Sequence, residues 1–366
     1  MEEGITNEKK LHPLIRLVIL LGLLYIFFVS ISLMGASFKF FGKDFAKQLL
    51  ETTANPFVGL FIGVLSTALV QSSSTVTSMA VGMVAGGALD VTRAIPIIMG
   101  ANIGTSVTNT LVSVGHIARE DEFKRAFSAA TVHDFFNLLA VVIIFPIQLT
   151  TNFLGIFSNY MAIGLKDAGG LKMANPIKAI VEPTVGLIQD ITGNSGTIML
   201  IISIVLLFIA LRYLVVNLKS VIIGKVENFF DNTLFRNAGR AFVLGIILTT
   251  IVQSSSITTS LAVPLAGAGI LTLRQIFPFT LGANIGTTVT AMLASLVTGN
   301  LAAVTVAFAH LLFNITGIVV IWPLNRIPIA FAEKLAEYAV KSKWVPLVYI
   351  VIVFFIIPLI LIYFAG

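Results

Sequence analysis

Two identical polar tetrads interrupt long apolar stretches of the sequence, Gln71-Ser72-Ser73-Ser74 and Gln253-Ser254-Ser255-Ser256. A helix that begins in a serine run presents free backbone N–H groups and the positive end of its dipole, and the hydroxyls add further donors. Such a helix end attracts anions. Two of these ends facing each other suit a multivalent oxyanion, so the tetrads predict an oxyanion site built from both serine runs.

A second pair of identical segments supplies the complementary chemistry. Gly100-Ala101-Asn102-Ile103-Gly104-Thr105 recurs as Gly282-Ala283-Asn284-Ile285-Gly286-Thr287. Paired glycines loosen a helix and free its carbonyl groups, and Asn and Thr add side-chain oxygens. Hard cations such as Na+ prefer ligands of this kind. Because no basic residue is conveniently placed in the stretches around the tetrads, cations would have to help neutralise the anion, and ion-coupled import is the economical prediction.

Both pairs of segments are separated by the same offset of 182 positions, which also relates Pro96 to Pro278. Further along, with five residues fewer, His133-x-x-x-Asn137 recurs as His310-x-x-x-Asn314. The chain therefore contains an internal duplication. The predicted units are a first repeat (1–160), an extracellular linker (161–195), a second repeat (196–325) and a C-terminal helix region (326–366).

The composition assigns these repeats to a membrane. Apolar residues make up 57% of the chain and charged residues 11%, less than half of the roughly 25% typical of soluble domains. A lipid bilayer is thus the expected surrounding. The absence of cysteine argues against thiolate metal sites and disulfides. The basic residues are scattered, which argues against nucleic acid as a partner.

Intervals without charge predict the membrane-spanning elements. Single spans, which need roughly 20 apolar residues, fit Arg16–Lys39, Arg93–Arg119, Asp190–Arg212 and the stretch after Lys343. The first of these is interpreted as a retained span, not a signal peptide. The tetrads lie in longer intervals, 38 residues between Glu51 and Asp90 and 33 between Arg240 and Arg274, which predict helical hairpins. A helix interruption at that depth must be buried in protein or line a wet cavity.

The number of crossings predicts how the repeats face. If each hairpin enters and leaves on one side, three crossings separate equivalent points, so the repeats are inverted, a design typical of transporters. With the N-terminus cytoplasmic and the C-terminus extracytoplasmic, 16 of the 23 basic residues fall in cytoplasmic segments, as the positive-inside rule requires. These are Lys9, Lys10, Arg16, Arg119, Lys124, Arg125, Arg212, Lys219, Lys225, Arg236, Arg240, Arg274, Arg326, Lys334, Lys341 and Lys343.

The predicted fold class is therefore an all-α polytopic membrane protein. It has two inverted-topology repeats, each with a re-entrant helical hairpin and an interrupted transmembrane helix. One extra C-terminal span follows the repeats.

Asp134 is the only charged residue between Arg125 and Lys166, and its counterpart in the second repeat is Leu311. An ionised carboxylate within a spanning helix costs about 2.5 to 3.5 kcal/mol, so Asp134 should have a partner. The asymmetry suggests a cation site in one half only. A structural role near the cytoplasmic loop stays open.

The tetrads, the segment from Pro96 to Asn109 and the segment from Ala130 to Asn137 resemble the type II sodium-phosphate cotransporter family. The resemblance implies Na+-coupled uptake of inorganic phosphate by an elevator-like or related alternating-access movement. It implies a Na+ site at Gln253, Ser254, Ser255, Thr287 and Thr290, phosphate at the serines of both tetrads, and a further Na+ site at Asp134 and Asn137. An Asp at this place implies electrogenic transport. Gln71, Asn102, Thr105 and Asn284 complete the candidate Na+ ligands, and no organic cofactor is expected.

Two departures from the family pattern concern the periphery. Vertebrate members carry a long disulfide-bonded extracellular loop between the repeats, where this chain has only the short stretch 150–190, and they have one more C-terminal span. Both departures suggest a minimal prokaryotic member in the plasma (inner) membrane. A homodimer is left open as its assembly.

Two alternatives remain. The same architecture could move another oxyanion, such as sulfate or a dicarboxylate. A membrane-embedded hydrolase would use a serine with His133 and Asp134, but the duplication of every candidate group except Asp134 is not what a triad requires, and no nucleophile-elbow pattern surrounds the serines. His133 and His310 equally suit the bridging of helices.

Overall fold

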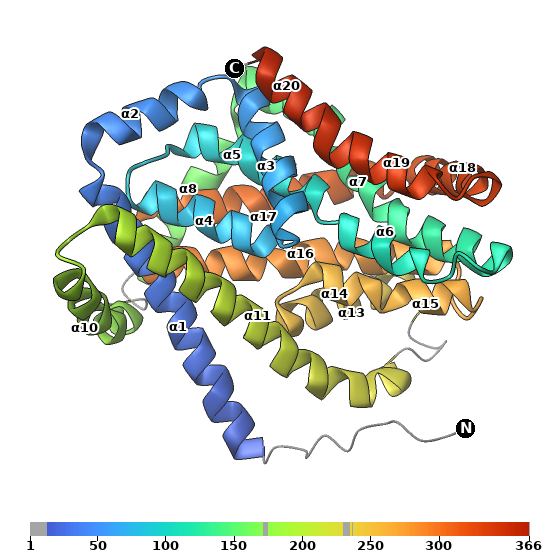
Figure 1. Cartoon of the computed structure of the whole chain (residues 1–366), viewed down its shortest axis with the longest axis horizontal. Helices are drawn as coiled ribbons and strands as arrows, with labels where there is room; N and C mark the ends of the chain where they lie inside the picture. The colour runs from blue at the N-terminus through green and yellow to red at the C-terminus, as the bar shows by residue number, and fades with distance from the viewer. Residues whose placement is uncertain (1–12, 171–174, 230–234, 236, 366) are drawn as a thin grey trace.

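A computed structural model describes residues 13–170, 175–229, 235 and 237–365 (Figure 1). All regular structure in these ranges is helical. The helices are α1 (Pro13–Phe40), α2 (Gly42–Thr52), α3 (Pro56–Val70), α4 (Ser73–Ala85), α5 (Val91–Gly104), α6 (Val107–Val114), α7 (Glu120–Thr151), α8 (Phe153–Asp167), α10 (Asn175–Ile191), α11 (Gly196–Phe229), α13 (Ala238–Val252), α14 (Ser255–Ser260), α15 (Ala262–Gly267), α16 (Leu273–Thr298), α17 (Leu301–Ile321), α18 (Arg326–Lys341), α19 (Val345–Val351), the π-helical turn η1 (Ile352–Ile356) and α20 (Ile357–Ala365). Lys9, Lys10, Arg236 and Gly366, which entered the predictions of topology and boundaries, lie outside the described residues.

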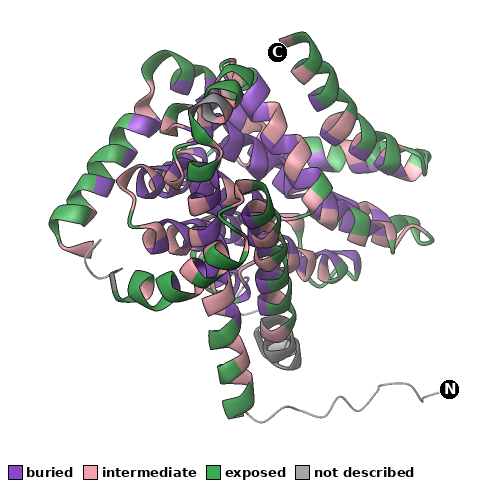
Figure 2. Cartoon of the chain, turned by 60° about the vertical axis from the view of Figure 1, so that its left-hand side comes forward, coloured by how far each residue is buried: buried purple, intermediate pink, exposed green. Residues whose placement is uncertain are grey.

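Seven helical stretches in the described ranges are long and apolar enough to cross a bilayer. They are Leu14–Phe40, Val91–Val114, Glu120–Thr151, Gly196–Asn217, Leu273–Thr298, Leu301–Ile321 and Val345–Ala365. Large apolar side chains stay exposed along the outer helices. In Figure 2 the free end of α1 and the C-terminal helix are largely exposed. Hydrocarbon would cover these surfaces at no cost, and the expected all-helical polytopic class is confirmed.

Each tetrad breaks a helical hairpin, as predicted. The first hairpin is α3 and α4, and the second is α13 with α14 and α15. Both hairpins return close to where they begin. Arg93 Nε, after the first hairpin, donates to Leu50 O before it (3.1 Å), and Ala238 and Arg274, which flank the second, line one cavity. The short break between α14 and α15 at Leu261 has a local cause, because Pro264 has no N–H to offer the carbonyl of Ser260.

The two breaks have the same backbone geometry. Gln71 and Gln253 adopt left-handed φ values of 57° and 58°, which end the first arm, and extended Ser72 and Ser254 then begin the second. A left-handed conformation is uncommon for a residue with a side chain. Its presence at both glutamines, 182 positions apart, shows that the duplication in sequence extends to local structure.

Glycines let the first arm of each hairpin lie against the backbone of a neighbouring helix. A Cβ on Gly100 would lie 1.8 Å from Leu60 O of α3, and one on Gly282 would lie 1.9 Å from Phe242 O of α13. A Cβ on Gly63 of α3 would likewise overlap a backbone carbonyl of α5, and one on Gly245 of α13 would overlap a backbone carbonyl of α16. The sequence analysis predicted that the glycines of the repeated segments loosen the helix, whereas the structure shows that they permit close packing of two helix backbones.

The expected interruption of the repeated Gly-Ala-Asn-Ile-Gly-Thr helix occurs in the first half only. The helix breaks between α5 and α6 at Thr105 and Ser106, but α16 continues without a break through Thr287, so the prediction was wrong there. The physical reason lies in the donors available. In the first half, Asn137 Nδ2 donates to Asn102 O (2.8 Å) and Ser256 Oγ donates to Thr105 O (3.1 Å), which satisfies carbonyls at the break.

The region interpreted as a linker, 161–195, is mostly helical in the described residues. It holds the end of α8, which packs against α17, and all of α10, which packs against α1. Tyr25 of α1 contacts Thr184 of α10 through their hydroxyls (2.5 Å). The predicted boundary at residue 160 falls inside α8.

Gly100→Ala should destabilise the protein, because the new methyl group would overlap the carbonyl oxygen of Leu60 and force α3 and α5 apart. Overpacking of this kind costs about 1–3 kcal/mol. The measurement is the apparent melting temperature of the purified protein in detergent. Gly22→Ala in α1 is the matched control, since nothing lies within 4 Å of its new Cβ. Equal melting temperatures for the two variants would contradict the close approach.

Candidate functional site

Both tetrads line one cavity of about 750 Å³. Its wall includes Gln71, Ser72 and Ser74 of the first tetrad and Gln253, Ser254 and Ser256 of the second, and α11 closes it from Phe208 to Val216. Ser73 and Ser255 are buried and are not among the residues that line the cavity. The structure therefore brings together the two serine runs that the sequence places 182 residues apart.

The serines of the tetrads differ in how their hydroxyls are used. Ser72 Oγ caps α4 by accepting from Thr75 N (3.2 Å), and Ser254 Oγ caps α14 by accepting from Ile257 N (3.4 Å). Ser256 Oγ donates to Thr105 O in the other half of the chain. The hydroxyl of Ser74 has no partner among the described residues and faces the cavity. Each cap hydroxyl accepts from one backbone N–H and so stabilises the N-terminus of its half-helix, which is the end where anions bind most readily.

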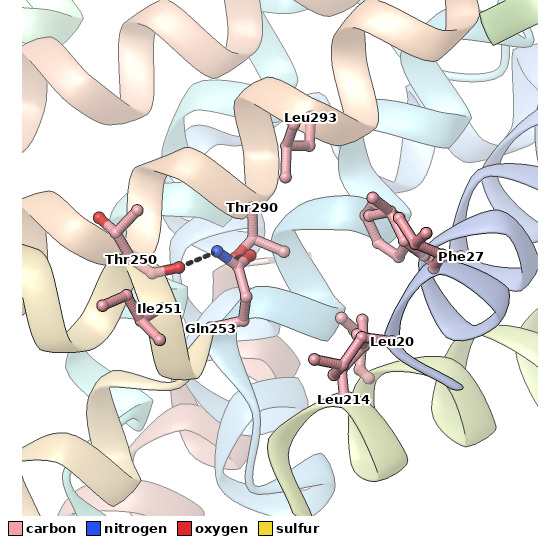
Figure 3. Close-up of a pocket in the computed structure, with 11 residues that line it drawn as sticks. Leu20, Phe27, Leu214, Thr250, Ile251, Gln253, Thr290 and Leu293 are labelled. Atoms are coloured by element: carbon pink, nitrogen blue, oxygen red, sulfur yellow. Dashed lines mark hydrogen bonds between the residues drawn. The ribbon is translucent and has the colours of Figure 1, made fainter. Parts of the chain in front are cut away.

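Each tetrad glutamine is held by a threonine from the neighbouring helix. Thr290 Oγ1 donates to Gln253 Oε1 (2.7 Å), and the amide of Gln253 donates to Thr250 O (Figure 3). In the first half, Thr108 Oγ1 donates to Gln71 Oε1 (2.9 Å). The sequence interpretation paired Gln253 with Thr290 but missed Thr108, although the 182-residue offset from Thr290 leads directly to it.

The asparagines of the repeated segments meet in a buried cluster. Asn284 Oδ1 lies 2.5 Å from His133 Nε2, and Asn284 Nδ2 donates to Asn137 Oδ1 (2.9 Å). On the other side, Asn102 Oδ1 lies 3.5 Å from His310 Nε2. All five side chains are at most 3% exposed. The predicted ligands Asn102, Asn137 and Asn284 are thus joined to one another and to both histidines across the two halves of the chain.

Thr105 and Thr287 occupy equivalent places. Each hydroxyl donates to the carbonyl four residues earlier in its own helix, Ala101 O (3.1 Å) and Ala283 O (3.0 Å). Thr287 and Thr290 lie three residues apart and so share a face of α16. The first half also contacts the helix that begins in the second tetrad, since Asn109 Nδ2 donates to Thr259 Oγ1 of α14 (2.8 Å).

Asp134 is fully buried and has the partner that its burial requires. Tyr349 Oη of α19 donates to Asp134 Oδ2 (3.0 Å), while Asp134 Oδ1 has no partner in the described part of the chain. Asp134 and Asn137 do not share a partner, because Asn137 bonds to the asparagine cluster. Tyr349 was missed by the sequence interpretation, and no repeat could have indicated it, because α19 lies outside the duplicated segments.

Arg212 of α11 is a third residue, after Thr108 and Tyr349, that sequence reasoning missed. It lines the cavity that contains both tetrads. In the sequence it stands at the end of a span, where it was counted only as a cytoplasmic charge.

Comparison with known proteins agrees with this constellation. Residues 26–165 and 206–323 match the Na+/Pi-cotransporter family, and these ranges contain both tetrads, the asparagine cluster and Asp134. The chain belongs to this family. It is a family of transporters, not enzymes, and His133 faces Asn284, not a tetrad serine, so the hydrolase alternative is dropped.

The family includes mammalian relatives of similar sequence. The chain is 34% identical to human sodium-dependent phosphate transport protein 2B over 94% of its own length and 64% of that protein. It is 32% identical to rat sodium-dependent phosphate transport protein 2A over 94% of its own length and 67% of that protein. The chain therefore spans about two thirds of the length of these relatives. No solved structure matches it significantly.

Removing the hydroxyl of Tyr349 should destabilise the protein only while Asp134 is present, because a buried carboxylate would lose the donor that satisfies it. Hydrogen bonds to charged groups contribute about 1.5–3 kcal/mol. The measurement is a double-mutant cycle of unfolding free energies with Tyr349→Phe, Asp134→Leu and the pair. Leucine is the natural replacement, since Leu311 stands at the corresponding position. Strictly additive effects would refute the interaction.

Proposed function

We propose that this multi-pass membrane protein imports inorganic phosphate coupled to Na+, by alternating access and with net movement of charge. The observation that carries the proposal is the single cavity lined by both serine tetrads. Membership of the Na+/Pi-cotransporter family agrees with it. The names of the mammalian relatives, sodium-dependent phosphate transport proteins, point to the same substrate and coupling ion.

Phosphate is proposed to bind the serines of both tetrads, Ser72, Ser73, Ser74, Ser254, Ser255 and Ser256. The half-helices that begin at Ser73 and Ser255 have free backbone N–H groups at their N-termini, and residues of both first turns line the cavity. A tetrahedral oxyanion has enough acceptor positions for donors from both sides at once. The free hydroxyl of Ser74 is the side-chain donor already available to it.

Na+ is proposed to bind at Gln253, Ser254, Ser255, Thr287 and Thr290. In the structure Thr290 Oγ1 donates to the side-chain amide oxygen Oε1 of Gln253. A Na+ ion would replace this hydrogen bond, because it could take both oxygens as ligands. Gln71, Asn102, Thr105 and Asn284 are the further candidate ligands around the first tetrad and the asparagine cluster, and Asp134 with Asn137 is the proposed place of an additional ion.

Alternating access is proposed to follow from two inverted repeats. The recurrence of break geometry and of glutamine–threonine bonds at one sequence offset supports the repeats. Lys124 and Glu337 form an ion pair (3.3 Å) between two segments that the topology assigns to the cytoplasm. Asn55 Nδ2 donates to Ala365 O (2.8 Å), which joins the C-terminus to a segment assigned to the outside.

The proposed surrounding is the plasma (inner) membrane, with the N-terminus cytoplasmic and the C-terminus extracytoplasmic. The homodimer stays a prediction.

The decisive experiment is uptake of radiolabelled phosphate into proteoliposomes with and without an inward Na+ gradient. We expect uptake above the equilibrium level only with the gradient. Competition by unlabelled sulfate or a dicarboxylate separates the remaining alternative, since effective competition at equal concentration would identify another oxyanion as substrate. Uptake that ignores the Na+ gradient would refute coupling.

Gln253→Ala and Thr287→Ala should each weaken the activation of uptake by Na+, because each removes an oxygen ligand from the proposed ion site. The half-activating Na+ concentration should rise several-fold, and protein abundance should fall much less. Thr288→Ala is the control, since its hydroxyl donates to Ile285 O within its own helix and belongs to no proposed site. Unchanged Na+ dependence would remove the two residues from the site.

Asp134→Gly should lower the charge moved per phosphate, because the proposed additional Na+ would lose its only anionic ligand. The measurement is the ratio of electrical current to radiolabelled flux, taken on the same preparation. A variant that transports with the wild-type ratio would refute the electrogenic role of Asp134.

A further inference from the structure

We infer that Arg212 is a specificity-determining residue of the phosphate path: its guanidinium supplies the fixed positive charge for a multivalent oxyanion in the cavity between the tetrads. This inference rests on the proposed function and deepens it. The sequence had suggested that Na+ alone would have to neutralise the anion, because the hairpins contain no suitably placed basic residue. In the structure a basic residue of α11, Arg212, lines the cavity.

The charge of the cavity wall is the first argument. Among the described residues that line the cavity, Arg212 is the one charged side chain, and the others are serine, threonine, glutamine, tyrosine and apolar residues. No carboxylate opposes it there. A cavity with one sign of charge and walls of low dielectric focuses its field on an entering ion. This cavity therefore selects anions before any hydroxyl is in contact.

The position of Arg212 beside the second tetrad is the second argument. Its neighbour Leu211 lines both this cavity and the adjoining apolar pocket in which Gln253 meets Thr290. Gln253 also lines both spaces. The turn of α11 that carries Arg212 thus runs past the tetrad, and Arg212 lines the same cavity as Ser254 and Ser256.

The third argument is that Arg212 has no other electrostatic task in the described part of the chain. The ion pairs of the described residues involve Lys47, Arg93, His116, Arg119, Lys124 and Lys178, and none involves Arg212. An unpaired guanidinium keeps its planar set of donors free for a bidentate contact with two oxygens of an oxyanion. A lysine, being a point charge, would reproduce the attraction but not the bidentate geometry.

Equilibrium binding of radiolabelled inorganic phosphate to the purified full-length protein, at fixed Na+, tests the inference without requiring transport. Arg212→Gln should raise the dissociation constant about tenfold or more, the usual consequence of losing one charge-assisted hydrogen bond. Arg212→Lys should give an intermediate value. Arg240 is the control, because it is exposed like Arg212 but lines a different cavity. Arg240→Gln should stay within about twofold of the wild type.

Chemical protection keeps the test valid if Arg212→Gln does not fold. Phenylglyoxal modifies accessible arginines, and peptide mass spectrometry reports the rate at each site in the wild-type protein. Phosphate with Na+ should slow modification at Arg212 and leave Arg240 unaffected. This readout would not move if Arg212 only anchored α11 at the membrane surface.

The outcomes separate the inference from the proposed function. If the wild-type protein binds phosphate and Arg212→Gln binds it with the same affinity, the inference is overturned and phosphate transport still stands. The absence of protection at Arg212 would have the same meaning. Wild-type protein that neither binds nor transports phosphate would overturn the proposed function and the inference with it. Weaker binding in Arg212→Gln together with protection at Arg212 supports both.

Discussion

The structure depends on one constraint: a backbone that stops being helical inside a membrane must find partners for the N–H and C=O groups that it frees. At both tetrads a left-handed glutamine ends one half-helix and a serine caps the next. The capping serine satisfies only one of the free N–H groups. Residues of both breaks line one cavity. We propose an oxyanion as its ligand, because uncapped N–H groups at helix N-termini bind anions.

The two halves of the chain satisfy this constraint differently. In the first half the helix after the hairpin is broken, and Asn137 and Ser256 donate to carbonyls at the break. In the second half α16 is unbroken, and Asn314, the counterpart of Asn137, donates instead to His310 O of its own helix (3.2 Å). The histidine–asparagine distance is correspondingly short on one side of the cluster and long on the other. Duplicated residues thus occupy two arrangements in one molecule.

Sequence was sufficient for most spanning elements and for the places where the hairpins break. Charge-free intervals and the 182-residue offset predicted these features, because they follow from local composition and internal repetition. The grouping of Gln253 with Thr290 came from the family resemblance, and the structure joins them by a hydrogen bond. Sequence failed for Tyr349 beside Asp134, because Tyr349 comes from outside the repeats. It also failed for Arg212, which lies in the second repeat but was counted only as a cytoplasmic charge at the end of a span. It also failed for α16, since identical residues break a helix only where a third element offers donors to the freed carbonyls.

The most direct measurement is the position of a heavy oxyanion in crystals grown with Na+. Arsenate has the shape and charge of phosphate, and its arsenic atom is located by anomalous scattering. We expect one peak in the cavity between the tetrads, with oxygens within hydrogen-bonding distance of serine hydroxyls from both Ser72–Ser74 and Ser254–Ser256. A peak bound by only one tetrad, or by neither, would contradict an oxyanion site shared by two broken helices.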